Sequence, residues 1–131
     1  MGAPLDMFRA LADEVRLRIL GSLLVAELSV AELVEVLGLP QSTVSRHLKP
    51  LREAGLAETR REGTSVYYRR GALVEEADLA ALLDHRLGQL PTAVRDAAAV
   101  EVRIEIAFDS IEGLRQQRQQ MAARLAQKFL T

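Results

Sequence analysis

The segment from Glu32 to Tyr68 constrains the fold more than any other, because two helical patterns meet there at a glycine and two β-prone runs follow. Ser29 and Glu32 have the spacing of a capping box at the start of the first short helix, and Gly38 is placed to end that helix. Two helices joined by a turn of about three or four residues that contains glycine are typical of a helix-turn-helix. We therefore predict this unit here.

The second helix of the unit has two chemically different faces. Val44, Leu48 and Leu51 recur at helical spacing, which predicts a buried stripe. The opposite face carries hydroxyl and cationic side chains, which can hydrogen-bond base edges or pair with phosphates. A polar helix face is also what a simple solvated surface looks like, so the flanking elements decide between the two interpretations. The residues of this helix that we predict to contact DNA are Gln41, Ser42, Thr43, Ser45, Arg46 and Lys49.

The two β-prone runs, Leu56–Arg61 and Ser65–Arg70, surround Gly63, and a glycine at the tip predicts a β-hairpin. Arg60 and Arg61 lie near that tip. A basic hairpin tip can contact phosphates or the minor groove beside a recognition helix. We therefore expect both arginines to anchor a DNA-binding wing. The expected fold is a winged helix-turn-helix, mainly α-helical with a small β-hairpin.

The charge is unevenly distributed along the chain. With 17 basic and 18 acidic residues, the net charge of −1 argues against a nucleic-acid binder. Residues 41–70, however, hold seven basic and three acidic residues, whereas residues 71–112 hold three basic and nine acidic ones. The local charges of +4 and −6 predict a basic face on an acidic body.

Several functional classes find no support in the 131 residues. The chain has no cysteine, which excludes disulfides, thiolate metal sites and cysteine catalysis. It contains no glycine-rich nucleotide loop and no serine-hydrolase or zinc-protease motif, so we expect no enzyme. His47 lies at the edge of the apolar stripe and is interpreted as a packing residue in preference to a DNA contact or metal ligand. His85 has only one neighbouring carboxylate, that of Asp84, and such a pair is common on helix surfaces. We therefore expect no metal and no cofactor there.

No apolar run reaches the length of roughly 18–20 residues that spans a membrane. The first six residues also lack the pattern of a signal peptide. We therefore expect a cytoplasmic protein that does not interact with membranes.

The composition changes after Arg70, which predicts a DNA-binding domain at residues 1–72 and a helical C-terminal extension at residues 73–131. In this extension we expect one amphipathic helix over residues 71–90 and a longer helix from Thr92 onward. Val100–Phe108 alternates apolar and other residues as a strand would, but a helix with two apolar faces fits the same pattern. We favour the helix, because a lone strand has no pairing partner.

Residues 8–70 resemble the ArsR/SmtB family of bacterial winged-helix repressors, and the resemblance covers about half of the chain. The similar motifs are Phe8–Leu20, Ser42–Leu56 and Arg60–Arg69. The resemblance implies a homodimer, paired through C-terminal dimerisation helices, that represses a promoter until an inducer binds. It also implies that Ser42, Thr43, Ser45 and Arg46 occupy base-reading positions. A dimer with two-fold symmetry presents one recognition helix from each subunit, so the expected partner is double-stranded DNA with an inverted-repeat operator.

Two departures from the family bear on the inducer. Ser29 and Ala31 stand where metal-sensing members carry a cysteine motif, and Asp84 and His85 are adjacent with no second histidine following. We therefore expect an organic inducer. The extension resembles that of family members linked to methyltransferase domains, which suggests an adenosyl-sulfur metabolite as an example. Its pocket is expected around Leu83–Phe108. The alternatives are a constitutive DNA-binding protein and a protein-interaction module on the same fold.

Overall fold

The computed structural model describes residues 4–130. The chain divides into two units, the first ending at Val100 and the second starting at Glu101. Residues 1–3, on which the expectation about a signal peptide partly rests, lie outside the described residues.

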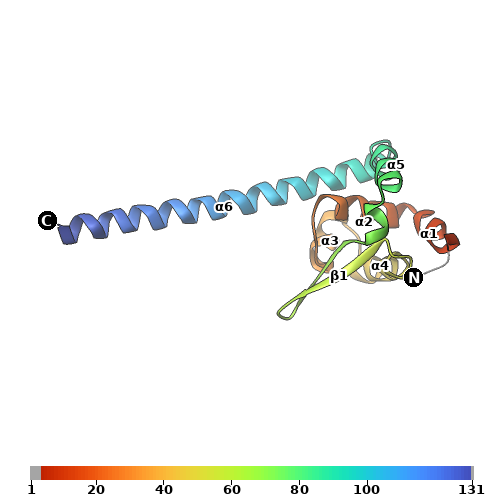
Figure 1. Ribbon diagram of the computed structural model, residues 1–131, viewed down its shortest axis with the longest axis horizontal. Coiled ribbons are helices and arrows are strands. Elements are labelled where there is room, and N and C mark those ends of the chain that lie inside the picture. Colours follow the sequence, from red (N-terminus) through yellow and green to blue (C-terminus); the bar gives the residue numbers. More distant parts are fainter. Residues whose placement is uncertain (1–3, 131) are drawn as a thin grey trace. The chain divides into compact units, whose positions relative to one another are not determined.

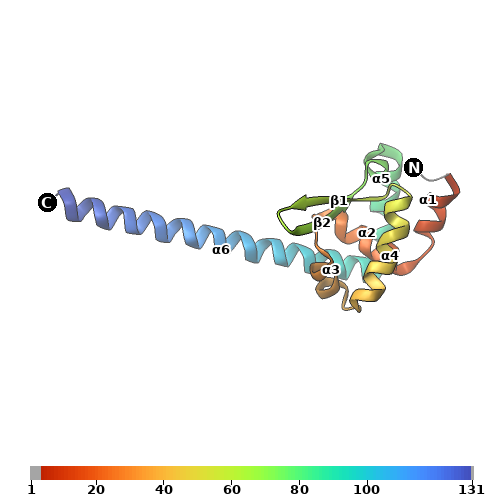
Figure 2. The same cartoon turned by 90° about the horizontal axis from the view of Figure 1, so that it is seen from below.

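The first unit begins with four helices, which Figures 1 and 2 show grouped together: α1 (Pro4–Leu11), α2 (Glu14–Val25), α3 (Val30–Leu37) and α4 (Gln41–Glu53). The predicted capping box is confirmed, because the Glu32 N–H donates to Ser29 Oγ at 3.2 Å and the Ser29 N–H donates to Glu32 Oε1 at 3.0 Å. Gly38 ends α3 in the left-handed conformation, with φ of 66°. Pro50 lies inside α4, which continues to Glu53.

The wing consists of β1 (Ala57–Glu62) and β2 (Ser65–Arg70), paired antiparallel with Glu62 opposite Ser65. Gly63, the first residue of the two-residue turn, has φ of 62°, a conformation that glycine adopts without strain. The predicted hairpin is therefore confirmed, and Figure 1 shows it projecting away from α3 and α4. An isolated bridge between Leu28 and Tyr68 joins β2 to the loop that precedes α3.

The prediction of one helix over residues 71–90 is wrong. The chain forms a short 3-10 helix, η1 (Ala72–Glu75), and then α5 (Ala77–Leu87), with Glu76 in an extended conformation between them. In one continuous helix Val74 and Leu83 would lie about 180° apart. Because the chain breaks at Glu76, both side chains enter the same core, where they are only 2% and 4% exposed.

The favoured helix at Val100–Phe108 is confirmed, and the alternative strand is wrong, because α6 runs from Pro91 to Leu130. The first ten residues of α6 belong to the first unit. The core of the first unit combines side chains from the helices of the winged helix-turn-helix with side chains from η1, α5 and the start of α6. It includes Ile19, Leu33, Leu48, Val74, Leu83, Ala93 and Val100. Residues 73–100 thus pack on the same core as the predicted DNA-binding domain. The division at residue 72 remains a prediction about function.

A buried ion pair connects the start of α6 to the helix-turn-helix. Arg18 in α2 donates from Nε to Asp96 Oδ2 at 2.7 Å and from Nη2 to Asp96 Oδ1 at 3.1 Å. Nη2 also donates to the carbonyl of Leu37, the last residue of α3, at 2.8 Å. The hydrogen bonds to Asp96 raise the pKa of Arg18. One guanidinium therefore links α2, the end of α3 and α6.

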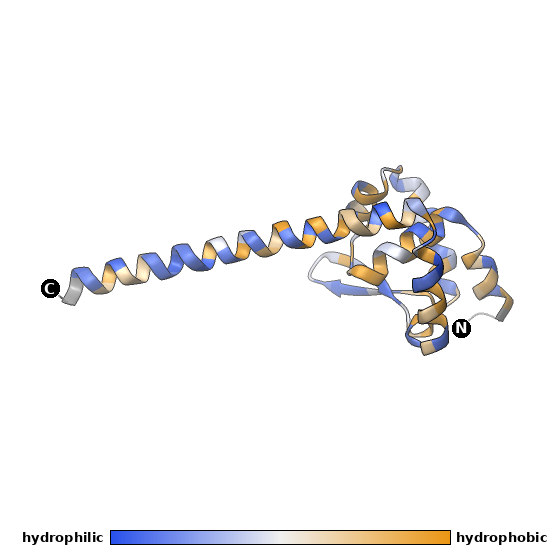
Figure 3. Ribbon diagram, turned by 90° about the horizontal axis from the view of Figure 1, so that it is seen from above, coloured by the Kyte–Doolittle hydropathy of each residue, from blue (hydrophilic) through white to orange (hydrophobic). Residues whose placement is uncertain are grey.

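The second unit is the remainder of α6, residues 101–130. Figure 3 shows apolar and polar residues interspersed along it. The larger apolar side chains between residues 102 and 125 are at least 46% exposed. Over the described part of the chain, none of the helices has both the length and the apolar character needed to cross a membrane.

Candidate nucleic-acid interface

Helix α4 is held by its apolar stripe. Val44, Leu48 and Leu51 are at most 1% exposed, and the helix packs against α1, α2 and α3 (Figure 2). Of the predicted DNA-contacting residues, Ser42, Ser45, Arg46 and Lys49 lie on the other side of the helix, and Gln41 and Thr43 lie in its first turn. Five of them are exposed and Thr43 is half-buried at the edge; the exposed ones are Gln41, Ser42, Ser45, Arg46 and Lys49. The fold therefore brings four of these residues together on one face of α4 and places the other two at its N-terminus.

The N-terminus of α4 has no side-chain cap. Pro40 precedes the helix and supplies only its carbonyl, which accepts from the N–H groups of Thr43 and Val44 at 3.1 Å. The first N–H groups of a helix are unsatisfied within the helix and carry partial positive charge. An anion such as a phosphate oxygen can fill that position.

The cations of residues 41–70 fall into two groups. Lys49, Arg60, Arg69 and Arg70 each lie within 4 Å of a carboxylate. Over residues 4–130, the structure shows no ion pair for the other three, which are Arg46, Arg52 and Arg61. All three are exposed. The positive charge available to an anionic ligand is therefore concentrated on these three side chains.

The two wing arginines, which the sequence did not distinguish, differ in their surroundings. Arg60 donates from Nε to Glu27 Oε2 at 2.6 Å and from Nη1 to Glu62 Oε2 at 3.1 Å. Its guanidinium carbon lies 5.1 Å from the centre of the Tyr67 ring. The hydrogen bond that Arg60 donates to Glu27 is the main cause of the raised pKa of Arg60. Arg61 projects from the other face of the strand, as the alternation of side chains requires, and is exposed.

Glu27 was not identified from the sequence. It lies in the loop after α2, 33 residues before Arg60, and its carboxylate also lies 3.8 Å from Arg69 Nη1. Arg69 in turn donates to Glu58 Oε1 at 2.6 Å. No local motif could have revealed the pairs of Glu27, because it lies in a different element, far from both arginines in the sequence; Glu58 and Arg69, by contrast, face each other directly in the hairpin.

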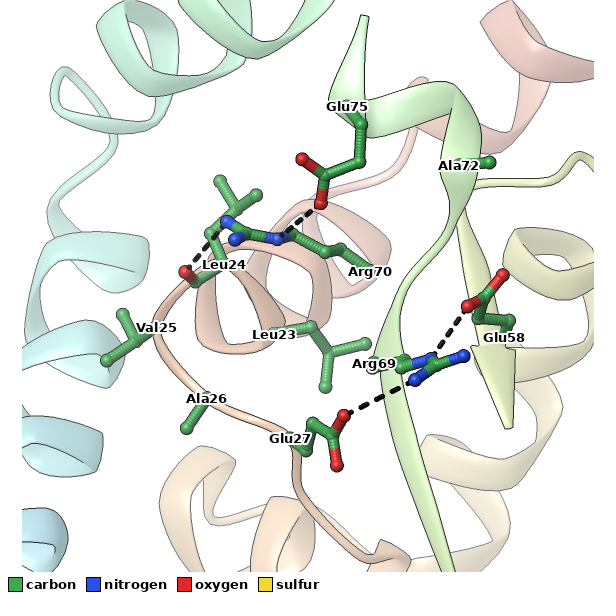
Figure 4. Close-up of a pocket in the computed structure, with 10 residues that line it drawn as sticks. All are labelled: Leu23, Leu24, Val25, Ala26, Glu27, Glu58, Arg69, Arg70, Ala72 and Glu75. Carbon is green, nitrogen blue, oxygen red and sulfur yellow. Dashed lines mark hydrogen bonds and ion pairs between the residues drawn. The ribbon is translucent and has the colours of Figure 1, made fainter. Parts of the chain in front are cut away.

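Glu27, Glu58 and Arg69 line a cleft of about 490 Å³ at the base of the wing, shown in Figure 4. Leu23, Leu24 and Ala72 contribute apolar surface, and Arg70 donates to the carbonyl of Leu24 and pairs with Glu75 at 2.8 Å. The predicted position of the ligand pocket, around Leu83–Phe108, differs from this cleft. Leu83, Leu87 and Val100 are instead packed in the core.

The two histidines have structural surroundings. His47 is half-buried, with Nδ1 3.3 Å from Arg16 Nη1 and 3.7 Å from Asp13 Oδ1, in agreement with its interpretation as a packing residue. His85 is exposed, and its Nε2 lies 3.4 Å from the Gln89 amide nitrogen. Among the residues that the structure describes, no three His, Asp or Glu side chains are grouped so that they could hold a metal ion.

Comparison with known proteins supports the winged helix-turn-helix fold. The profile of the arsR family of bacterial regulatory proteins matches residues 13–59. The HTH-type transcriptional regulator KmtR of Mycobacterium tuberculosis is 50% identical over 64 residues, which are 49% of each chain. The structure of HlyU from Vibrio cholerae is 41% identical with a TM-score of 0.54, over 63% of this chain and 88% of HlyU.

A third similar protein is Mb0332 from Mycobacterium bovis, whose fragment 1–100 was solved as a homodimeric winged helix-turn-helix DNA-binding domain. It is 36% identical with a TM-score of 0.53, over 61% of this chain and 70% of that fragment. The chain spans about half the length of the curated relatives that it matches. The similarity is therefore centred on the helix-turn-helix and the wing.

Proposed function

Because this chain belongs to the arsR family of bacterial regulatory proteins, we propose that it is a homodimeric transcriptional repressor that binds an inverted-repeat operator and is released by an organic inducer. The observation that carries the proposal is the exposed polar face of α4, held outward by a fully buried apolar stripe. The direction of regulation is part of the proposal, since HlyU of Vibrio cholerae is named a transcriptional activator.

In the proposed complex α4 enters the major groove. Ser42, Ser45 and Arg46 contact base edges, and the Arg46 guanidinium has the fork geometry that pairs with guanine. Gln41 and Thr43 lie at the uncapped start of the helix, where the backbone N–H groups face a phosphate. Lys49 contacts the backbone of the DNA. Its ion pair with Glu53, at 3.9 Å between exposed side chains, is weak enough to be replaced by a phosphate.

The wing contacts the flanking backbone through Arg61, which is exposed and near the hairpin tip. Arg60 acts in a different way. Its hydrogen bond to Glu27 ties the wing to the loop before α3, whereas its bond to Glu62 lies within β1, so that Arg60 sets the position of the wing and contributes less direct phosphate contact.

The proposed homodimer presents two copies of α4 to two half-sites about one or two turns of DNA apart. The homodimeric state of the Mb0332 fragment supports this part of the proposal. We assign dimerisation to the C-terminal extension, residues 73–131, as expected from the sequence.

The inducer is proposed to be organic because the chain has no cysteine and its histidines lie apart in the sequence. An adenosyl-sulfur metabolite remains the candidate. The cleft at the base of the wing supports the presence of a site, because about 490 Å³ lies within the range of small-molecule pockets, roughly 300–1,000 Å³. A ligand there would contact Glu27 and Arg69, which join the wing to the loop before α3.

The test is binding to DNA from the chain's own upstream region, measured by fluorescence anisotropy at several salt concentrations. Arg46→Ala should weaken specific binding by about 1–3 kcal/mol and relax the preference at one base position. Arg9→Ala removes an exposed cation of α1, outside α4, the wing and the C-terminal extension, and is the matched control, which should leave binding unchanged. Binding without any dependence on salt, or an equal loss in both variants, would contradict the proposed interface.

A second candidate, a protein-interaction module, is favoured by one observation, the exposed apolar side chains of α6. The same assay separates the two candidates. A protein-interaction module would show no salt-dependent binding to its upstream DNA.

A further inference from the structure

The part of α6 beyond the core has a continuous heptad pattern. From residue 97 to residue 125, apolar residues alternate at spacings of three and four, with Arg118 as the single interruption. Such a repeat of 3.5 residues is the signature of a helix that packs along another helix. The positions of this stripe, which we call the heptad stripe, are Ala97, Val100, Ile104, Ala107, Ile111, Leu114, Arg118, Met121 and Leu125.

The heptad stripe changes from buried to exposed where the second unit begins. Val100 is 0% exposed in the core, whereas Ile104, Ile111 and Leu114 are 46%, 51% and 59% exposed. The second unit is a single helix, so it contains no other element that could cover these side chains. A helix gains most of its stability from packing of its apolar face. The pattern therefore requires a partner along residues 104–125.

The charges along this helix indicate which partner fits. Residues 101–112 carry four acidic residues and one basic residue, a net charge of −3. Residues 113–128 carry four basic residues and no acidic residue, a net charge of +4. A second copy of the same helix in the opposite direction would place each acidic half beside a basic half. A parallel copy would place basic beside basic, with Arg118 against Arg118.

We propose that residues 104–121 pair with the same residues of a second copy as an antiparallel two-helix coiled coil. The proposal rests on the proposed homodimer and specifies its surface and direction. The register that best matches the two charged halves is centred between Glu112 and Gly113. It places Ile104 opposite Met121 and Ile111 opposite Leu114 of the second copy.

In this register Arg118 faces Ala107 of the second copy. The small side chain leaves room for the aliphatic part of arginine, and the guanidinium can extend to solvent within the acidic half of the other helix. The one polar residue of the heptad stripe is thus accommodated only when the helices run in opposite directions. A polar residue at such a position commonly determines the register and orientation of a coiled coil.

The first test measures self-association of the full chain by sedimentation equilibrium. Ile111→Arg places a charge in the heptad stripe and should raise the dimer dissociation constant at least about tenfold. Gln116→Arg adds the same charge on the outer, exposed face and is the matched control, which should leave the constant unchanged. Circular dichroism verifies that both variants stay helical. A wild-type chain that remains monomeric at tens of micromolar, as expected if another protein covers the stripe, would overturn the proposal.

The second test measures direction, and it uses the absence of natural cysteines. Spin labels are attached at Gly113→Cys, where an added Cβ meets no atom within 4 Å, or at Ala126→Cys. In the antiparallel register the labels at 113 lie near each other, whereas those at 126 are about 40 Å apart. Short distances at both positions would indicate a parallel pair, and a long distance at 113 would indicate no pairing. Either result overturns this proposal without affecting the proposed DNA binding, which is measured separately.

Discussion

Removal of the Asp96 carboxylate should destabilise the first unit strongly. In Asp96→Ala, Arg18 loses acceptors at 2.7 and 3.1 Å and keeps the Leu37 carbonyl at 2.8 Å. The guanidinium then remains in the core without a hydrogen-bonded counter-charge, because Arg18 is only 8% exposed and Asp96 was its bonded carboxylate. Breaking a buried pair from one side costs about 3–5 kcal/mol. This is a large part of the total stability of a typical domain, about 5–15 kcal/mol.

The measurement is urea unfolding followed by circular dichroism, compared with two further variants. Arg18→Met combined with Asp96→Leu removes both charges and fills the space with apolar atoms, so we expect its stability to lie within about 2 kcal/mol of the wild type. Glu53→Ala breaks the pair with Lys49, whose side chains are 78% and 66% exposed, and should cost at most about 1 kcal/mol.

The three results together test the reasoning. A strong loss in Asp96→Ala that the double variant restores indicates that the penalty comes from the unpaired buried charge. If Asp96→Ala costs less than about 1 kcal/mol, or no more than Glu53→Ala, then Arg18 reaches solvent or another partner and the account of this pair is wrong.

Four further predictions concern the interface and its supporting structure. Arg61→Ala should lower the slope of log affinity against log salt by roughly 0.9, and Arg60→Ala should lower it less because Glu27 holds that guanidinium; equal slopes would contradict the distinction. Ser29→Ala should cost about 1 kcal/mol in urea unfolding through loss of the capping box. Zinc and arsenite should leave operator affinity unchanged, and release below micromolar free zinc that His85→Ala abolishes would restore a metal-sensor function. Burial raises the pKa of Asp13, but the Arg16 N–H and the charges of His47 and Arg16 lower it more, so the folded pKa lies below the unfolded one. The ionised Asp13 therefore stabilises the folded state above the unfolded pKa, near 3.9, and this stabilisation is lost as pH falls through the folded pKa. Below about pH 4, the free energy of unfolding should therefore fall less steeply with pH in Asp13→Asn than in the wild type.

The features that the sequence predicted correctly depend on neighbours within a few residues. The capping box joins Ser29 to Glu32, the buried stripe of α4 follows from helical spacing, and the hairpin follows from a glycine between two β-prone runs. Backbone geometry determines these relations without reference to the rest of the molecule. For the same reason the helix at Val100–Phe108 could be preferred over a strand, which needs a distant partner.

Features that join distant parts of the chain were decided only by the tertiary structure. The break at Glu76 follows from the need to bury Val74 and Leu83 in one core, and no local signal marks it. Arg60 and Arg61 are equivalent in the sequence and differ because Glu27, 33 residues away, reaches one of them. Arg18 and Asp96 are 78 residues apart and meet because α2 and the start of α6 pack together. A charged side chain finds its partner through the packing of the elements that carry it, and that packing depends on the whole core.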